Sequence, residues 1–332
     1  MPYLCQGMTS MFPSESDLTI CFAHVAYLLP QRFTLRKLPI RSFGVTSHDE
    51  LDARIGEADV LVISGLWRNE LAARAPKLRF IQSVGAGTDQ FDRAVLKERG
   101  IRLASAQGVN INAVSEHVIS LILALARRLP EARDNQAKHV WRGMISDLTQ
   151  REDELGGKTL LVVGLGGIGG RLARLAKAFD MRVIGVKRDL SKGTEGADSV
   201  HTLAELKTLL PQADFVALTC PLTRETENVI DAAAFAKMKP CAYLINAARG
   251  RCVEEGALIE ALRKGSIAGA ALDVTVDEPL PPASPVWGLS NVFITPHTAG
   301  ETRRYEDNVL DILLDNLQRL WRGEAMLRNQ IV

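Results

Sequence analysis

Three side chains with complementary chemistry lie in loops that directly follow predicted buried strands. Arg249 is in NAARG, Glu278 is in DVTVDEP and His297 is in TPHTAG. The carboxyl ends of parallel strands meet at one edge of a sheet, and α/β proteins place their ligands there. We therefore expect the three side chains to lie near one another, although each alone has a simpler interpretation as a turn or surface residue.

Together the three groups suit the reduction of a carbonyl. A histidine such as His297 can donate a proton to the forming alkoxide and take it back in the reverse direction. A carboxylate beside it, Glu278, would hold the tautomer of the imidazole. Arg249 can bind a substrate carboxylate and polarise the neighbouring carbonyl. Because the imidazolium and the guanidinium supply the electrophilic groups, we expect no metal ion in this site.

A glycine-rich unit upstream predicts a dinucleotide site. Residues Leu160–Arg188 show the pattern of a strand, a tight turn, a helix and a second strand. The turn has the pattern G-x-G-x-x-G, with glycines at Gly164, Gly166 and Gly169. These permit the sharp turn, the approach of a pyrophosphate and the packing of helix on strand. Backbone N–H groups near Gly167 and Ile168 would face the phosphates. The alternatives are a glycine turn in an ordinary α/β unit and a methyl-donor nucleoside site.

The end of the second strand bears on the choice of dinucleotide. An NAD site expects an acidic residue there for the ribose hydroxyl, whereas this chain has Lys187 and Arg188, with Lys192 soon after. Two cations would bind a 2′-phosphate. We therefore predict NADP(H) over NAD(H), with NAD(H) still possible. The absence of an acid also argues against a methyl-donor site, and the alternative is that these are ordinary surface charges.

Length and composition exclude several classes of function. With 332 residues, 46% hydrophobic content and a net charge of +1, the chain fits a soluble protein of two domains. It has no basic footprint for nucleic acid or an anionic membrane. Five scattered cysteines without C-x-x-C fit reduced thiols in a cytoplasm. Residues 1–17 are expected to be a leader with little structure. They lack the basic residues of a signal peptide, and Leu18–Pro30 is too short to span a bilayer.

The alternation of strands and helices predicts parallel sheets with helices on both faces. The strands expected first are Leu18–Phe22, Arg36–Ile40, Asp59–Ser64, Phe80–Val84 and Ile101–Ala104, and the helices between them are Ser47–Ile55, Trp67–Ala75 and Phe91–Gly100. Asn112 is expected to cap a long apolar helix, Ala113–Arg128, which is followed by a polar, irregular segment at Glu131–Glu154. In that helix Glu116 and His117 are expected to face solvent or a domain seam. The alternation resumes after residue 188 and closes with the helix Thr302–Leu320.

The chain resembles the D-isomer-specific 2-hydroxyacid dehydrogenase family from about residue 60 to 325. The motifs that carry the resemblance, all in family order, are VGAGTDQFD at 84–92, SEHVISLILALARR at 115–128, GLGGIG, CPLT, NAARGRCVEEGAL, ALDVTVDEPLP and TPHTAGET. The resemblance implies two Rossmann-like, doubly wound parallel-sheet domains. A dinucleotide-binding domain, residues 107–297, is inserted into a flavodoxin-like substrate domain of residues 1–106 and 298–332. It also implies a homodimer formed largely by the dinucleotide-binding domains.

The resemblance implies a role for each matching residue. Arg249 would orient a 2-oxo acid, Glu278 would pair with the acid/base His297, and the backbone N–H groups of Ala86 and Gly87 would hold the substrate carboxylate. The remaining implied cofactor contacts are Asp273 at the nicotinamide amide, Ala247 on the nicotinamide side, and Cys220, Pro221 and Thr226 on the adenosine side.

Three positions qualify the resemblance. Lys187 replaces the usual acid, and Ser115 stands where the family usually has alanine, with little effect expected. Trp141 falls in a segment that in some relatives reaches the partner's active site. A surface or dimer-packing role is the favoured interpretation here.

The function expected from these observations is an NADP(H)-dependent 2-hydroxyacid dehydrogenase. It would reduce a small 2-oxo acid such as glyoxylate or hydroxypyruvate to the D-2-hydroxy acid. One alternative is an NAD-linked dehydrogenase of a phosphorylated acid; the cations available for it are Arg68, Arg74, Lys77 and Arg79. A dinucleotide-sensing, corepressor-like binding protein is another. A formate dehydrogenase is disfavoured because it needs no histidine–glutamate pair.

Overall fold

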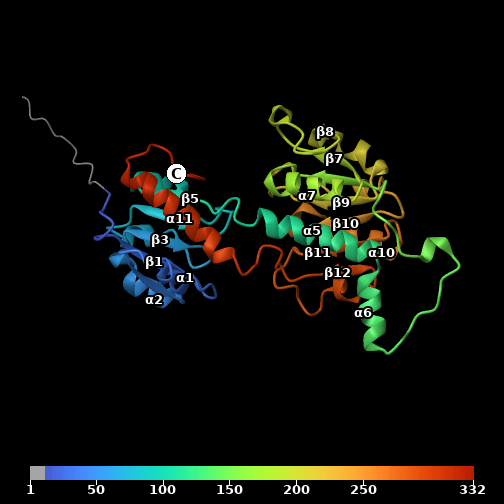
Figure 1. Cartoon of the computed structure of the whole chain (residues 1–332), viewed down its shortest axis with the longest axis horizontal. Coiled ribbons are helices and arrows are strands. Elements are labelled where there is room, and N and C mark those ends of the chain that lie inside the picture. The colour runs from blue at the N-terminus through green and yellow to red at the C-terminus, as the bar shows by residue number, and fades with distance from the viewer. Residues whose placement is uncertain (1–11) are drawn as a thin grey trace, which may run out of the picture. The chain divides into compact units, whose positions relative to one another are not determined.

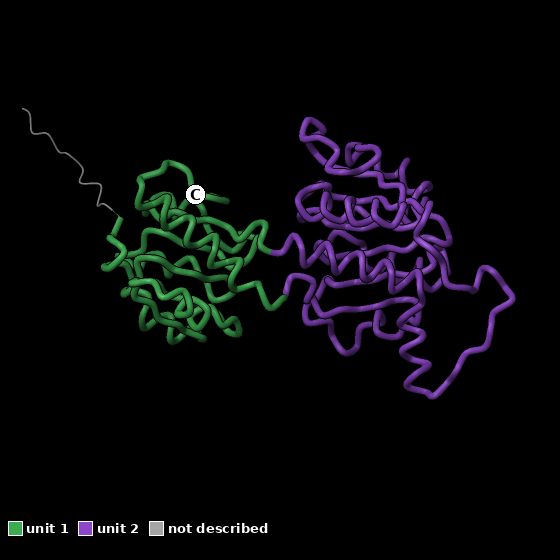
Figure 2. The backbone as a smooth tube through the Cα atoms, in the orientation of Figure 1, with its two compact units in different colours: residues 1–109, 302–332 green, residues 110–301 purple. Residues whose placement is uncertain are grey.

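The computed structural model describes residues 12–332. The chain divides into two compact units: unit 1 is residues 1–109 and 302–332, and unit 2 is residues 110–301 (Figure 2). The chain leaves unit 1 once and returns to it, so unit 2 is an insertion. Residues 1–11, which include Cys5 and most of the expected leader, lie outside the described part. No helix within residues 12–332 is both long and apolar enough to cross a membrane.

Unit 1 is a five-stranded parallel sheet in the order β2-β1-β3-β4-β5 with helices on both faces (Figure 1). Its strands are β1 Thr19–Ala23, β2 Arg41–Val45, β3 Val60–Ile63, β4 Phe80–Ser83 and β5 Arg102–Ala104. Its helices are α1 Leu29–Thr34, α2 His48–Arg54, α3 Leu71–Arg74, α4 Arg93–Glu98 and α11 Tyr305–Trp321. Alternate residues of β3 face opposite cores: Val60 and Val62 share one with α11, and Leu61 and Ile63 share the other with α2.

Unit 2 is a seven-stranded parallel sheet in the order β12-β11-β10-β9-β6-β7-β8. Its strands are β6 Thr159–Val163, β7 Arg182–Val186, β8 Ser199–His201, β9 Phe215–Leu218, β10 Tyr243–Asn246, β11 Gly269–Leu272 and β12 Val292–Ile294. Its helices are α5 Ile111–Ala126, α6 Leu129–Ala137, α7 Gly167–Lys177, α8 Leu206–Leu209, α9 Ala232–Phe235 and α10 Glu255–Arg263. The predicted fold class, two doubly wound parallel-sheet domains, is confirmed.

Several local predictions in the chain are wrong or incomplete. The strand expected at Arg36–Ile40 lies at β2 instead, because Lys37 has a left-handed φ of 53° that ends α1 and strand pairing with β1 starts only at Arg41. Helix α3 is shorter than expected. Asn112, expected to cap the long apolar helix, lies inside that helix, α5, and the residue at the N-cap position is Asn110. The segment expected to be irregular contains α6, and β8 was not foreseen.

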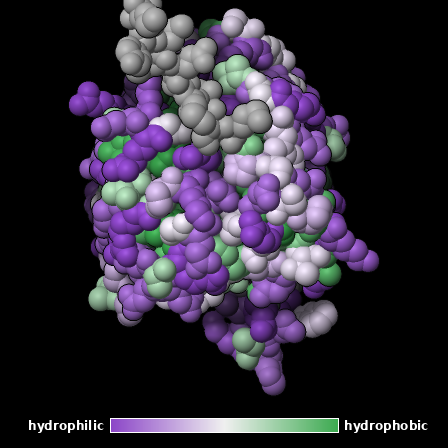
Figure 3. Space-filling view, turned by 90° about the vertical axis from the view of Figure 1, so that its left-hand side faces the viewer, coloured by the Kyte–Doolittle hydropathy of each residue, from purple (hydrophilic) through white to green (hydrophobic). Residues whose placement is uncertain are grey.

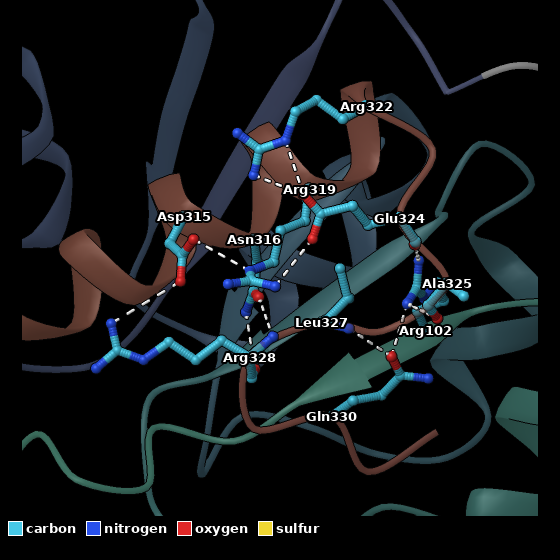
Figure 4. Close-up of polar contacts among 10 residues, drawn as sticks. All are labelled: Arg102, Asp315, Asn316, Arg319, Arg322, Glu324, Ala325, Leu327, Arg328 and Gln330. Atoms are coloured by element: carbon cyan, nitrogen blue, oxygen red, sulfur yellow. Dashed lines mark hydrogen bonds and ion pairs between the residues drawn. The ribbon is translucent and has the colours of Figure 1, made fainter.

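The C-terminal segment covers the edge of the unit 1 sheet. Gln330 pairs antiparallel with Ala104, and the N–H of Ile331 donates to Leu103 O at 2.7 Å. Arg102 fastens the segment from the side, with hydrogen bonds to Ala325 O at 2.9 Å and Gln330 Oε1 at 2.6 Å (Figure 4). An edge strand left open would offer unpaired backbone groups to other chains.

The face of the molecule in Figure 3 is mostly hydrophilic, with hydrophobic residues only in small separate areas.

Asn316→Ala is expected to lower the free energy of unfolding by about 3 kcal/mol. The fully buried Asn316 donates to Gln82 Oε1 at 3.1 Å. It also donates to Arg328 O at 3.1 Å and accepts from Arg328 N at 2.7 Å (Figure 4). Alanine leaves the buried Gln82 Oε1 and the part-buried backbone groups of Arg328 without these partners. Arg322→Ala, which removes only an exposed ion pair with Glu324, is the control and should cost at most about 1 kcal/mol. Urea unfolding measures both, and equal losses would contradict the prediction.

Candidate active site

His297 and Glu278 form a hydrogen-bonded pair at the ends of neighbouring strands. The loop after β12 carries His297, and the loop after β11 carries Glu278. Nδ1 of His297 lies 2.7 Å from Glu278 Oε2, and Glu278 Oε1 accepts the N–H of Thr275 at 3.1 Å. Within residues 12–332 the other ring nitrogen, Nε2, has no hydrogen-bond partner. The pair is half exposed, so Nε2 is free to exchange a proton with a bound molecule.

The loop after β10 places Arg249 next to the Glu278 loop. Asn246, buried at the end of β10, accepts the N–H of Ala248 and donates to Arg249 O, both at 3.0 Å. Gly250 lies so close to the next loop that a Cβ there would be 2.0 Å from Thr275 O. The Arg249 and Glu278 loops are therefore packed backbone to backbone. Ala247, expected on the nicotinamide side, immediately follows β10.

The buried carboxylate of Asp273 holds the loop that carries His297. Its Oδ1 accepts Thr295 Oγ1 at 2.6 Å and the N–H of Thr298 at 3.0 Å. Its Oδ2 accepts the N–H of Ala299 at 3.1 Å. In the structure this carboxylate binds the loop after β12 in its own unit. Its expected contact with a nicotinamide amide stays a prediction.

The glycine turn has the geometry that a dinucleotide requires. Gly164 has a φ of 105°, and a Cβ at this position would lie 2.5 Å from Cys220 N. A Cβ at Gly169 would lie 2.3 Å from Gly164 O, so only glycine lets α7 pack here. Gly166 precedes α7 and faces open space, and the α7 N-terminus has no side-chain cap. Among residues 12–332 the N–H groups of Gly167 and Ile168 have no partner, so they fit a pyrophosphate.

Lys187 and Arg188, the two cations that follow β7, differ in their hydrogen bonding. Lys187 Nζ donates to Gly193 O in the following loop, whereas Arg188 makes no hydrogen bond within residues 12–332. Asp189, the first acid after the strand, is engaged locally: it accepts from Ser191 N at 3.1 Å and Ser191 Oγ at 2.6 Å. The acid is thus occupied in capping a short turn. Arg188 is the cation that is open to a ligand.

A carboxylate near Arg188 escaped the sequence reasoning. The Thr223 hydroxyl and the Glu225 backbone N–H, followed by the charges of Arg188 and Arg224, lower the pKa of Glu225. The loop after β9 therefore adds both an acid and a further cation to the surroundings of Arg188. The sequence does display this acid in the stretch RET that follows CPLT, but no local pattern indicates that the stretch lies near β7.

The remaining residues expected on the adenosine side build the loop after β9. The buried Thr226 donates to Pro221 O at 2.6 Å and accepts Thr223 N at 2.7 Å, so its hydroxyl closes the loop on itself. A hydrogen bond with the Cys252 thiol and then burial raise the pKa of Cys220. A thiol that stays protonated is a poor nucleophile, which agrees with a packing role for Cys220.

Ala86 and Gly87 lie in the loop after β4 and belong to unit 1, whereas the residues above belong to unit 2. Ser83 Oγ and Ala106 N both donate to Gly85 O at 3.0 Å and so hold the start of this loop. Within residues 12–332 the N–H groups of Ala86 and Gly87 have no partner. They fit the expected role of anchoring a carboxylate, which stays a prediction.

Ser115 and Trp141, two positions that qualified the resemblance, lie in different surroundings. Ser115 is buried and accepts Arg171 Nη1 at 2.9 Å, so it links α5 to α7 rather than replacing alanine silently. Trp141 is 98% exposed, and it borders a hollow of about 670 Å³ beside α6. None of the predicted site residues lines that hollow. This hollow and the predicted site therefore lie in different places.

The comparisons with known proteins agree on one family. The model described as "D-isomer specific 2-hydroxyacid dehydrogenase, NAD binding domain" matches residues 119–299. A glyoxylate reductase of Korarchaeum cryptofilum is 32% identical over 315 residues, which cover 89% of this chain and 94% of the relative. A D-3-phosphoglycerate dehydrogenase of Methanocaldococcus jannaschii is 35% identical over 284 residues, which cover 85% of this chain but only 53% of that longer relative.

A solved structure shows the same architecture over nearly the whole chain. It is a D-isomer specific 2-hydroxyacid dehydrogenase family protein from Aeromonas salmonicida, with a TM-score of 0.83 and 32% identity. The match covers 96% of this chain and 99% of the other.

Proposed function

The chain belongs to the D-isomer specific 2-hydroxyacid dehydrogenase family, and we propose that it uses NADP(H) to reduce a small 2-oxo acid. Membership of the family makes it an NAD(P)-dependent oxidoreductase acting on CH–OH groups. The substrate class is that of glyoxylate and hydroxypyruvate, and the product is the D-2-hydroxy acid. The observation that carries the proposal is the 2.7 Å pair of Glu278 and His297, which leaves Nε2 of the imidazole free.

The residues of the site divide the work of carbonyl reduction among them. Nε2 of His297 donates a proton to the carbonyl oxygen while Nδ1 stays hydrogen-bonded to Glu278, which stabilises the imidazolium before transfer. Arg249 binds the substrate carboxylate and draws charge from the adjacent carbonyl. The dinucleotide, when bound, supplies the hydride to the carbonyl carbon. In the reverse direction His297 takes the proton back.

The turn after β6 and the segment after β7 would hold the dinucleotide. The N–H groups of Gly167 and Ile168 bind the pyrophosphate, and Arg188, with Lys187 beside it, binds the 2′-phosphate. Lys187 already donates one of its three ammonium hydrogens to Gly193 O, which restricts where the ammonium can lie and weakens its share. Glu225 opposes the 2′-phosphate, so the preference for NADP(H) rests mainly on Arg188.

The relatives named D-3-phosphoglycerate dehydrogenase keep a phosphorylated substrate as the second candidate. That substrate requires free cations in unit 1. Arg68 and Arg74 both bind Asp52, at 2.7 and 3.1 Å, so their charges are already partly neutralised. Lys77 and Arg79, the other two cations considered, form no ion pair within residues 12–332 and keep this candidate open. The homodimer and the cytoplasmic location stay predictions.

The proposal predicts turnover with NADPH and glyoxylate or hydroxypyruvate, faster than with NADH. Initial rates with both dinucleotides and with glyoxylate, hydroxypyruvate, pyruvate and 3-phosphohydroxypyruvate measure this directly. Turnover with NADH alone would contradict the cofactor assignment and leave the enzyme class intact. Activity confined to the phosphorylated acid would favour the second candidate. Tight dinucleotide binding without any turnover would favour a sensing protein.

A further inference from the structure

His117 on α5 is joined to the loop of the acid/base through one hydroxyl. Its Nε2 lies 3.0 Å from Thr295 Oγ1 and 3.5 Å from Asp273 Oδ1. The Thr295 hydroxyl donates its single hydrogen to the Asp273 carboxylate at 2.6 Å. It therefore has to accept from His117, so the imidazole of His117 carries a hydrogen on Nε2. We call this chain of His117, Thr295 and Asp273 the α5 relay.

The α5 relay ends on the backbone around His297. Asp273 accepts the N–H groups of Thr298 and Ala299, the two residues that follow His297. His297 itself has a left-handed φ of 56°. Such a conformation is unfavourable for a non-glycine residue and persists only where its surroundings fix it. The Asp273 carboxylate holds the two residues that follow His297, and in this conformation the imidazole is hydrogen-bonded to Glu278.

The donor at the start of the relay is itself anchored. Helix α5 is fastened to α7 by Arg171, which donates to Ser115 Oγ at 2.9 Å and to Glu116 Oε1 at 2.7 Å. Asp273 is buried, and its carboxylate accepts the Thr295 hydroxyl in addition to the N–H groups of Thr298 and Ala299. Because His117 donates to the Thr295 oxygen, the hydroxyl hydrogen of Thr295 has to point away from His117 and toward Asp273.

We propose that His117 is a positioning residue: through Thr295 and Asp273 it holds the backbone loop in which His297 meets Glu278. This inference rests on the proposed function, in which His297 is the acid/base. His117 does not touch the reacting atoms, and it acts only by restricting where the His297 imidazole lies. A displacement of a catalytic group by about 1 Å costs about 100-fold in rate.

The test compares two variants of His117 in the full-length protein. His117→Phe keeps a planar ring without a donor and is expected to lower kcat by about 100-fold, with the KM for NADPH within about twofold. His117→Gln keeps an N–H near the position of Nε2 and should restore most of kcat. Amide hydrogen exchange at Thr298 and Ala299, followed by NMR, should be slow in the wild type and His117→Gln but at least about tenfold faster in His117→Phe.

The controls separate positioning from loss of folding. Glu116→Gln changes the neighbouring exposed residue on α5 and should leave kcat and both amides unchanged. If His117→Phe fails to fold, Thr295→Val, which removes only the connecting hydroxyl, should give the same losses.

Two results would overturn the inference: slow exchange at both amides in His117→Phe, or fast exchange with an unchanged kcat. If the wild type shows no turnover with any 2-oxo acid while the amides respond as expected, the proposed function fails and the relay stands.

Discussion

His297→Asn is expected to lower kcat by about 10²–10⁴-fold, with the Kd for NADPH changed by less than about twofold. Nε2 of His297 is the proton donor of the site, and its geometry comes from the 2.7 Å bond between Nδ1 and Glu278. Asparagine keeps a polar side chain of similar reach but has no group that exchanges a proton near neutral pH. Stopped-flow single turnovers measure the chemical step, and fluorescence titration of NADPH measures binding.

His201→Asn is the matched control for this prediction. His201 also faces a glutamate, with Nδ1 3.1 Å from Glu205 Oε1, but this pair lies at β8 on the opposite edge of the sheet. The control should retain nearly full kcat. Near-normal turnover in His297→Asn would remove His297 from the mechanism, and equal losses in both variants would point to a general loss of folding.

The double variant Lys187→Asp with Arg188→Ala is expected to change the ratio of kcat/KM for NADPH to that for NADH by about 100-fold, in favour of NADH. Each lost charge-assisted contact to the 2′-phosphate is worth about 1–3 kcal/mol. The new aspartate supplies an acceptor for the ribose hydroxyls and repels the phosphate. Because Lys187 is bonded to Gly193 O, Arg188→Ala alone should produce most of the change.

A second change near Arg188 should act in the opposite direction. Glu225→Gln removes a carboxylate whose surroundings include the charge of Arg188, so it should favour NADPH further. Lys207→Ala is the control, because this lysine pairs with Asp231 elsewhere in unit 2. An unchanged NADPH KM in the double variant would show that the 2′-phosphate binds elsewhere or that the chain uses NAD(H).

Several features of the fold were predictable because they depend on neighbours in the chain. The strand, glycine turn and helix around Gly164 follow from sterics and hydrogen bonds over a few residues, and the structure matches them closely. The strand near residue 40 was misplaced for a related reason. Its register is set by pairing with Thr19, which no pattern within the segment displays.

The sequence by itself determined the chemistry available to this protein. It has a glycine turn for a dinucleotide, two cations after the next strand of that unit, and an arginine, a glutamate and a histidine after later strands. Only the tertiary structure decided which of these groups meet. It placed β10, β11 and β12 side by side, so that Glu278 binds His297 across 19 residues and His117 reaches Thr295 across 178. It also placed Glu225 near Arg188. Local patterns encode backbone conformation, whereas contacts between loops depend on the order of strands in the sheet, which is settled by packing of the whole core.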